Sequence, residues 1–502
     1  MLKRVRIILT VLLLLATVGV DAQVTTASMA GKVTDASNEP IIGATVQAVH
    51  QPSGSRYGTV TNVDGRYSIQ GMRTGGPYRV EISYIGYQTV IYKDITLQLG
   101  EVYNLNVEMS ESSELLNEVI VTAAKTKFTA EKTGATTNIS SAQITQLPTV
   151  NRSISDIARL SPYANGMSFA GGDGRSTNFT IDGANFNNNF GLSSNLPGGG
   201  NPISMDAIEE VQVVVAPFDV RQTNFIGGGI NAITKSGTNT FRGTAYTYYR
   251  NQDMRGNRIN GEDLGARSDE SKTTYGFTLG GPIIKNKLFF FVNYEKEKTP
   301  GEVIKYRARE DGEDAKGMVS RTLKSDMEKV YNHLKDKYGY DAGSYTNFPA
   351  DEENTKLLAR IDWNITDRHR LSLRYNNTKN TAWNAPNGNS SDTGYRLNNT
   401  YRVGTQSMAF ANSMYSMDNK VQSWAADLNS RFTDKISNQL LFTYTNIEDM
   451  RGTNSSPFPF IDIMAGKDEN GNQILEPYMS AGYELFTSVS YTHLTLPTNS
   501  RV

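Results

Sequence analysis

The sequence predicts a mostly β protein, with a small sandwich near its N-terminus and a long series of antiparallel strands after it. Residues from about 30 to 109 alternate short apolar runs with turn signals such as Asp64-Gly65. Beyond about residue 240 the alternating runs are longer and are joined by short turns. The composition agrees, because 26 Tyr, 19 Phe and 44 Gly suit strands and turns.

Charge and cysteine content exclude several classes of protein. The 50 basic and 51 acidic residues give a formal charge of -1, which argues against a nucleic-acid binder that must neutralise many phosphates. The chain has no cysteine, so it has no disulfides, thiolate nucleophile or cysteine-ligated metal.

The first 22 residues have the three parts of a secretory signal peptide. Basic residues in Met1–Arg6 precede an apolar run from Ile7 to about Val18, and the small residue Ala22 stands at the expected cleavage site. The alternative is a transmembrane anchor, but the run is shorter than the ~20 apolar residues that a spanning helix needs. No later run is long enough either, so any membrane-spanning part must be a β-barrel.

Residues 23–110 are predicted to form the sandwich. The chain has Gly31-Lys-Val33, then Pro40-Ile-Ile-Gly43, then Asp64-Gly65-Arg-Tyr67, and finally Gly86-Tyr87. This order of motifs resembles the carboxypeptidase regulatory-like domain, a transthyretin- or immunoglobulin-like sandwich. The resemblance implies an accessory domain and no peptidase activity.

Residues 111–124 are predicted to be a linker that contains an extended recognition segment. The run Glu118-Val-Ile-Val-Thr-Ala123 resembles the TonB box, whose backbone edge pairs with a strand of the energy-coupling protein TonB. Its β-branched residues favour a strand, and pairing at a strand edge uses backbone groups. The alternative interpretation is one more ordinary strand of the sandwich, and both stay open.

Residues 125–239 contain five landmarks that together resemble the plug domain of TonB-dependent outer-membrane transporters. This resemblance implies an α+β fold inside a barrel. The landmarks are Asn138–Ile144, Ile154–Pro162, Asn178–Gly183, Ile208–Val215 and Gly227–Gly237. The segments Pro217–Phe225 and Asn185–Asn189 look most like the Oar-like branch, with the SusC-like branch as the alternative.

Residues 240–488 are predicted to be the first strands of an antiparallel transmembrane β-barrel. Leu357, Ala359, Ile361 and Trp363 share one face of a strand, and short turns alternate with long polar connections, which is typical of outer-membrane barrels. The pattern from Val319 to Leu334 predicts an amphipathic helix in one long loop, either capping the loop or contacting substrate.

The barrel is expected to be incomplete at its C-terminal end. We count about seven strands, whereas a plugged lumen belongs to barrels of ~22 strands. Residues 489–502 resemble one reading frame of a sequencing-library adapter, and we predict that they are a sequence artefact.

No pattern for covalent chemistry is found, so we expect no enzyme activity and no cofactor. His50, His333, His369 and His493 form no zinc-binding motif, and His50 is interpreted as a surface residue of the sandwich. The glycine runs lack the lysine of a phosphate-binding loop. Asp468–Asn472 lacks the distal glutamate of an EF-hand calcium loop, so a polar turn is favoured.

The resemblance implies TonB-dependent active transport of a peptide, protein, glycan or metal chelate across the bacterial outer membrane. The implied partners are TonB with its inner-membrane energising complex, an unknown extracellular substrate and outer-membrane lipid, with the sandwich and plug on the periplasmic side. The alternative is a structural or adhesive outer-membrane protein without energy coupling. The implied TonB-box residues are Glu118, Val119, Ile120, Val121, Thr122 and Ala123, and the plug landmarks, interpreted as structural, are Asp182, Gly183, Glu209, Glu210, Gly227, Gly228 and Gly229.

Overall fold

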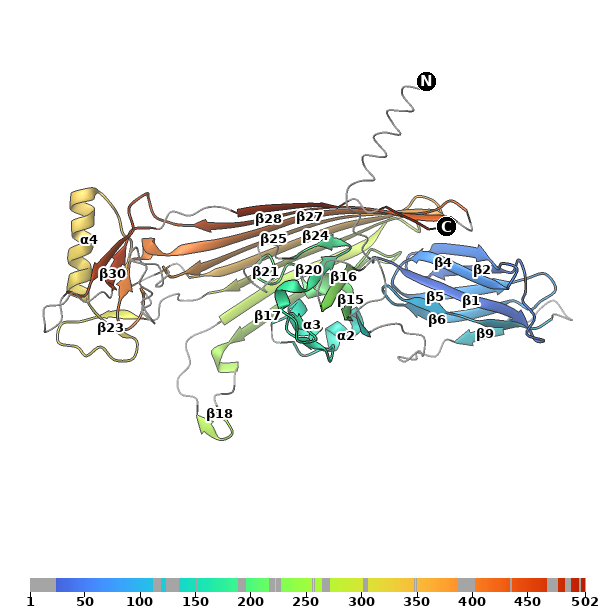
Figure 1. Ribbon diagram of the computed structural model, residues 1–502, viewed down its shortest axis with the longest axis horizontal. Coiled ribbons are helices and arrows are strands. Elements are labelled where there is room, and N and C mark those ends of the chain that lie inside the picture. Colours follow the sequence, from blue (N-terminus) through green and yellow to red (C-terminus); the bar gives the residue numbers. More distant parts are fainter. Residues whose placement is uncertain are drawn as a thin grey trace, which may run out of the picture.

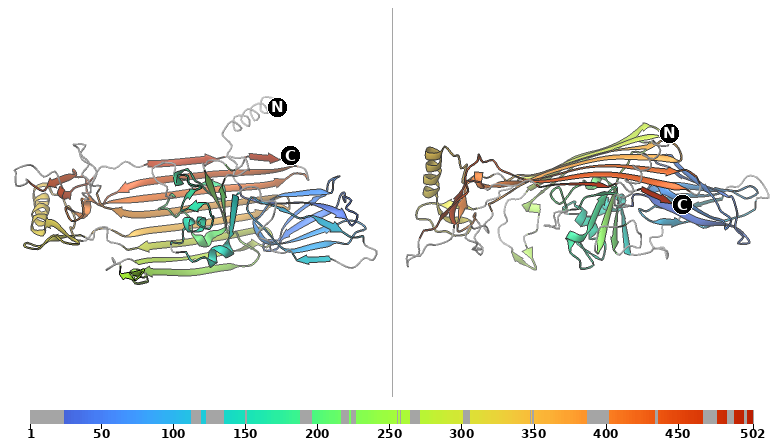
Figure 2. Two further views of the ribbon diagram at one scale, coloured as in Figure 1. Left: turned by 60° about the horizontal axis from the view of Figure 1, so that its bottom comes forward. Right: turned by 45° about the horizontal axis from the view of Figure 1, so that its top comes forward.

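A computed structural model shows three bodies of β-structure arranged along one long axis (Figure 1). A sandwich lies at one end, a long curved sheet forms most of the length, and the plug lies against one face of this sheet (Figure 2). The structure describes residues 24–111, 119–122, 135–149, 151–187, 196–215, 222, 227–254, 256, 258–263, 271–300, 306–346, 348, 350–386, 402–433, 436–466, 477–483, 489–495 and 498–501. The predicted signal peptide, residues 1–22, lies outside them.

The sandwich consists of two sheets that bury alternate residues of each strand. One sheet has the order β4-β1-β7, with β8 also paired to β1, and the other has the order β3-β2-β5-β6-β9. The core between them includes Met29, Val46, Tyr78 and Ile82. The strands are β1 (Ala27–Asp35), β2 (Thr45–His50), β3 (Ser55–Val60), β4 (Arg66–Met72), β5 (Gly75–Ser83), β6 (Val90–Leu97), β7 (Val102–Asn104), β8 (Val107–Met109) and β9 (Val119–Thr122).

The interpretation of His50 as a surface residue is wrong. His50 ends β2 with only 6% of its surface exposed, and its Nδ1 lies 2.7 Å from the Ser53 hydroxyl. Its ring also packs against Tyr78, with the ring centroids 4.9 Å apart. The sequence alone could not show this, because the residue is covered by neighbours that are distant along the chain.

The plug is a small α+β domain around a five-stranded sheet of order β10-β15-β16-β13-β14. Its core includes Phe179, Ile181, Val213 and Ile230, and almost every residue of β15 and β16 is buried. Its elements are β10 (Ala135–Ser140), α2 (Ser141–Gln146), α3 (Ile154–Ala158), β11 (Ala164–Asn165), β12 (Ser168–Phe169), η1 (Gly174–Ser176), β13 (Asn178–Ile181), β14 (Ala184–Asn185), η2 (Met205–Ala207), β15 (Ile208–Val215) and β16 (Gly228–Thr234).

The third body is a nine-stranded antiparallel sheet, which we call the wall. Its order is β17-β20-β21-β24-β25-β27-β28-β31, with β32 also paired to β28. The origin of the residues in β31 and β32, predicted above to be an artefact, stays a prediction. The strands are β17 (Arg242–Asn251), β20 (Ser271–Ile284), β21 (Leu288–Thr299), β24 (Glu352–Asn364), β25 (His369–Asn384), β27 (Tyr415–Arg431), β28 (Ser437–Gly452), β31 (Val489–Thr495) and β32 (Thr498–Arg501).

The two faces of the wall have opposite polarity. On the face against the plug, polar residues such as Asn293, Glu295 and Lys356 are buried. On the other face large apolar side chains are exposed, including Trp363 at 45% and Trp424 at 53%. A water-soluble sheet has the reverse arrangement, whereas a membrane barrel directs polar residues inward and apolar residues to lipid. The predicted fold class, with a partial barrel, is therefore confirmed.

At the end of the wall farthest from the sandwich, the connections between β21 and β24, between β25 and β27, and between β28 and β31 fold together into one unit, which we call the loop module (Figure 1). Met327 and Leu334 of the helix pack with Phe410 and Met479 from other connections. The elements in the long connections are η3 (Gln252–Met254), β18 (Arg258–Ile259), β19 (Glu262–Asp263), β22 (Arg307–Arg309), β23 (Val319–Leu323), α4 (Lys324–Tyr338), β26 (Met408–Ala409), η4 (Ala411–Ser413), β29 (Ile461–Met464) and β30 (Pro477–Ala481).

The predicted amphipathic helix is present but starts later than its apolar pattern. Residues 319–323 form strand β23, which pairs with β22, and α4 begins only at Lys324. The helix ends at Gly339, whose φ of 64° is the left-handed conformation that commonly closes a helix. The pattern from Val319 to Leu334 therefore spans a strand and a helix. In the strand part Val319 and Leu323 are only half-buried, whereas Met327 and Leu334 of the helix are buried.

We expect the sandwich to lose stability as the pH falls below about 6.5. Burial, together with the charge of Arg73, lowers the pKa of His50 from 6.5 to about 3. Between these values the unfolded chain binds a proton that the folded chain does not, so the free energy of unfolding should fall by up to about 1.4 kcal/mol per pH unit. Hydrogen exchange of the β2 amides at pH 7 and pH 5, corrected for intrinsic exchange rates, measures the change in this free energy. In the His50→Gln variant the free energy of unfolding should depend less on pH. An unchanged pH dependence would contradict the assignment of the effect to His50.

A second prediction concerns the close approach of two plug segments. A Cβ added at Gly228 would lie 2.5 Å from Cγ of the buried Phe169. Gly228→Ala should therefore destabilise the plug by about 1–3 kcal/mol, as overpacking usually does. Gly58→Ala is a suitable control, because its added Cβ meets only an ordinary 3.5 Å contact in the sandwich. Proteolysis of the plug under increasing denaturant would show the difference, and equal resistance of the two variants would argue against this packing.

Candidate functional site where plug, wall and sandwich meet

Asp182 is the plug residue around which the candidate site is built. It follows β13 in a left-handed conformation, with a φ of 45°, and Gly183 continues the turn with a φ of 79°. Its carboxylate accepts hydrogen bonds from the Thr234 backbone N–H at 2.9 Å and from the Thr234 hydroxyl at 2.5 Å. Thr234 is the last residue of β16, so the turn after one plug strand is fixed to the end of its neighbour.

Two wall arginines face this carboxylate. Arg360 of β24 lies 3.6 Å from one Asp182 oxygen, and Arg374 of β25 lies 3.7 Å from the other. Both arginines also donate to plug carbonyls, Arg360 to Thr234 at 2.8 Å and Arg374 to Ile181 at 2.7 Å. The plug is thus held to the wall by ion pairs and by hydrogen bonds to its backbone at the same point.

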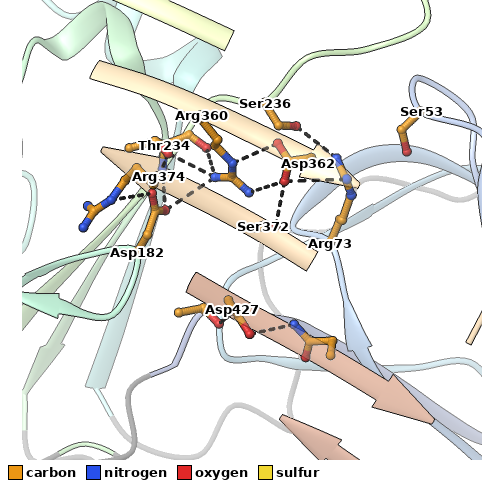
Figure 3. Close-up of polar contacts among 12 residues, drawn as sticks. Ser53, Arg73, Asp182, Thr234, Ser236, Arg360, Asp362, Ser372, Arg374 and Asp427 are labelled. Atoms are coloured by element: carbon orange, nitrogen blue, oxygen red, sulfur yellow. Dashed lines mark hydrogen bonds and ion pairs between the residues drawn. The ribbon is translucent and has the colours of Figure 1, made fainter. Parts of the chain in front are cut away.

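The contact extends into the sandwich through a second carboxylate. Arg360 donates twice to Asp362 of the same strand, at 2.9 and 3.0 Å, and the Asp362 side chain is fully buried. Arg73 of the sandwich lies 3.6 Å from Asp362 and donates to the plug residue Ser236 at 3.2 Å. Figure 3 shows Arg360 between the two carboxylates, with Arg73 next to Asp362. We call Arg73, Asp182, Arg360, Asp362 and Arg374 the ion network.

A cavity of about 430 Å³ lies beside the ion network. Its lining includes residues of the sandwich, the plug and the wall. Asp427 of β27 contributes to it and accepts a hydrogen bond from the hydroxyl of Thr25, at the start of the sandwich, at 2.7 Å. The site therefore combines a set of charges shared by three bodies with free space beside them.

A backbone contact joins the sandwich directly to the plug. The Leu99 N–H donates to Glu210 at 3.0 Å, and the Leu99 carbonyl accepts from Asn138 at 3.2 Å and from Gln212 at 2.5 Å. The Leu99 side chain packs with Val24 and the plug residue Ile233. Both backbone groups of one sandwich residue are therefore bonded to the plug strands β10 and β15.

Further contacts fix the sandwich to the short turns of the wall. Ser55 and Asn364 share a buried hydrogen bond, with the Asn364 amide nitrogen 3.0 Å from the hydroxyl. The Arg370 guanidinium lies over the Tyr57 ring, 3.8 Å from its centroid. These contacts lie at the end of the wall where its strands are joined by short turns, which is the periplasmic end of an outer-membrane barrel.

A second polar contact between plug and wall lies farther along the barrel. Glu295 of β21 accepts from Ser204 of the plug and from Tyr246 of β17, each at 2.8 Å. Lys356, whose side chain is 2% exposed, lies 2.8 Å from Glu295 and also pairs with Glu297. Because these buried charges are all paired, they hold the plug without leaving an isolated charge in the barrel.

The segment that resembles the TonB box is a strand in the structure. Residues 119–122 form β9, which pairs in parallel with β6 in the register Val90 to Val119 through Lys93 to Thr122. Glu118 and Ala123 lie outside the described residues. The strand geometry agrees with the alternative interpretation as part of the sandwich, but it does not test a TonB-binding role.

The plug landmarks lie at different points of the structure. Asp182 and Gly183 form the turn of the ion network, and Glu210 near the beginning of β15 receives the Leu99 N–H. Glu209 lines the cavity. Gly227, Gly228 and Gly229 lead into β16, with Gly228 against Phe169. Most of Pro217–Phe225, on which the Oar-like assignment rests, lies outside the described residues.

Four residues of the ion network were not expected from the sequence to have a functional role: Arg73, Arg360, Asp362 and Arg374. For the wall residues a signal was present, because Asp362 alternates with Ile361 and Trp363, and Arg374 with Leu373 and Tyr375. A charged residue between outward apolar ones must face the interior of a barrel. The alternation of charged and apolar residues does not identify the residue with which each inward charge forms a pair.

Neither a metal site nor a membrane-spanning helix is found in the part of the chain that the structure describes. No group of three or more His, Asp or Glu residues there could hold a metal ion. Among the same residues, no helix is long and apolar enough to cross a membrane.

Comparison with known proteins agrees with this architecture. Residues 28–110 match the carboxypeptidase regulatory-like domain, and residues 233–303 match an outer membrane beta barrel domain. The TonB-dependent transporter Oar of Myxococcus xanthus is 25% identical over 376 residues. The chain is similar to this transporter over 69% of its own length and 33% of the length of Oar. It therefore spans about a third of the curated relative that it matches.

Solved structures similar to the chain include a receptor and a transporter. One is the siderophore receptor PirA from Acinetobacter baumannii, with a TM-score of 0.43, 18% identity, and coverage of 73% of this chain and 45% of PirA. The other is the outer membrane transporter YddB from Escherichia coli, with a TM-score of 0.48, 15% identity and the same coverage. The wall polarity and the match to an outer membrane beta barrel domain place the chain in the outer membrane.

Neutralising Asp182 should loosen the plug. Asp182→Asn keeps the size of the side chain but leaves Arg360 and Arg374 without their plug carboxylate, and breaking a buried pair from one side costs about 3 kcal/mol. We expect faster hydrogen exchange in β13 and β16 and an unchanged sandwich. Asp64→Asn, at an exposed turn of the sandwich, is the control. If hydrogen exchange in β13 and β16 is equally slow in the two variants, the ion network does not hold the plug.

Proposed function

We propose that this protein takes part in TonB-dependent active transport across the bacterial outer membrane. The observation that carries the proposal is a plug seated against the wall through buried charged and polar contacts, beside apolar packing in which wall residues such as Phe291 and Leu358 join the plug core. Asp182 meets Arg360 and Arg374 at one end, and Ser204 meets Glu295 farther along. The polar contacts can be exchanged for water when the plug moves, whereas the apolar contacts would expose surface to water and so oppose the movement.

In the proposed mechanism, substrate binds from the extracellular side and TonB pairs with the segment around β9 in the periplasm. TonB then transmits force from the inner-membrane energising complex, the plug moves away from the wall arginines, and a path opens beside it. The cavity next to the ion network marks where this path would begin to widen. No residue of the protein makes or breaks a covalent bond in this mechanism.

The similarity to Oar supports energy-coupled transport and leaves the substrate class open among peptides, proteins, glycans and metal chelates. An adhesive role would use the loop module, which is one packed unit at the end of the wall opposite the sandwich. An adhesin has no need of a plug tied to the wall by paired charges, so transport is the function that the site favours.

The proposal predicts that a synthetic peptide of residues 114–127 binds the periplasmic domain of TonB. A peptide with Val119→Pro and Val121→Pro should bind at least about tenfold more weakly, because proline removes backbone donors that strand pairing needs. Fluorescence anisotropy of labelled peptides measures both affinities. Equal binding of the two peptides would rule out strand pairing, and no binding of either peptide or of the full chain would favour an outer-membrane protein without energy coupling.

A further inference from the structure

Strand β9 is the last strand of a sandwich sheet. The order of that sheet is β3-β2-β5-β6-β9, and β9 uses one of its edges to pair with β6. Within the described part of the chain, no strand pairs with its other edge. An edge strand of this kind presents a row of backbone donors and acceptors to an incoming strand.

We propose that β9 binds its periplasmic partner in place, as an edge strand of the sandwich, and that the sandwich thereby carries the pull to the plug. This inference rests on the proposed function, which names TonB as the partner. The proposed function itself requires only that residues 119–122 be available, as a free segment or as a strand.

Binding in place is favoured because β9 is already extended. A flexible segment must lose conformational freedom when it pairs with a partner strand, and this loss weakens binding. Residues 119–122 are Val, Ile, Val and Thr, which are all β-branched and suit a strand. Pairing with β6 therefore prepares the backbone for a second neighbour on the open edge.

The position of β9 also suits a periplasmic partner. In Figure 1 β9 lies along the edge of the sandwich away from the wall, while the other side of the sandwich faces the turns of the wall. The contacts of Ser55 with Asn364 and of Tyr57 with Arg370 come from β3, at the opposite edge of the same sheet. A strand added to β9 would therefore lie on the side of the sandwich away from the wall (Figure 1).

A short route leads from β9 to the plug. Strand β6 ends at Leu97, two residues before Leu99, whose backbone groups bond to Asn138, Glu210 and Gln212. Force applied to β9 would pass through β6 to this contact and so to the plug strands β10 and β15. If β9 instead left the sandwich when it bound, force would reach the plug only along the chain from residue 122 to residue 135.

Hydrogen exchange of the full chain in detergent, with and without the periplasmic domain of TonB, separates these two possibilities. Binding in place should slow exchange of residues 119–122 at least about tenfold and leave the β6 amides at residues 90–93 as protected as before. If β9 leaves the sandwich on binding, exchange at residues 90–93 should become faster, and that result would overturn the proposal.

A disulfide across the two strands gives an independent test. Lys93 and Thr122 are Cα partners, and opposed residues of neighbouring strands are close enough for a disulfide. Because the chain has no cysteine, Lys93→Cys with Thr122→Cys can form only this bond within one chain. The oxidised protein should bind TonB within about threefold of the reduced protein or more tightly. A tenfold or greater loss on oxidation, restored by reductant, would show that β9 must leave.

The remaining outcomes are also informative. The single variant Lys93→Cys controls for the effect of oxidation itself. Failure of the double variant to form a disulfide would contradict the pairing of β6 with β9, on which the proposal depends. If the peptide of residues 114–127 binds TonB but the oxidised chain does not, only this inference fails. If neither peptide nor full chain binds TonB, the proposed function fails with it.

Discussion

The structure depends on a carboxylate of the plug held between two arginines of the wall. Asp182 could not face Arg360 and Arg374 unless the turn after β13, the end of β16 and two neighbouring wall strands all had their observed register. The charges are sheltered from water, so each requires its partner, and the pairs fix the plug in one position. Asp362 and Arg73 extend the same requirement to the sandwich, which has a core of its own, whereas the plug and the wall also share apolar packing.

The wall can hold such charges because its polarity is inverted. Outward side chains such as Trp363 and Trp424 suit lipid, and inward residues such as Lys356 and Glu295 find partners in the plug or on adjacent strands. Polar contacts of this kind give position and specificity more than net stability, because bringing charges out of water offsets much of their attraction. The polar contacts therefore define the position of the plug against the wall.

The sandwich has a larger role in this arrangement than that of an appended domain. It supplies Arg73 to the ion network, bonds to the plug through Leu99 and contains β9, the strand formed by the candidate TonB box. The sandwich thus contains β9, which would receive the force, and contacts both the plug and the wall. Whether β9 acts as a free segment or as a fixed edge determines whether force reaches the plug through the linker or through Leu99.

From the sequence alone we could predict most of the wall strands, the inward and outward faces of the wall and a helix in the loop module, although the helix begins five residues later than its apolar pattern. These features follow from local periodicity and turn residues, which act over a few positions. The sequence marked Asp182 only as a turn residue, missed its arginine partners and placed His50 on the surface. Only the tertiary structure decided these points, because ion pairing and burial depend on which distant segments meet: Asp182 and Arg374 are far apart in the chain and touch only after the plug is seated in the wall.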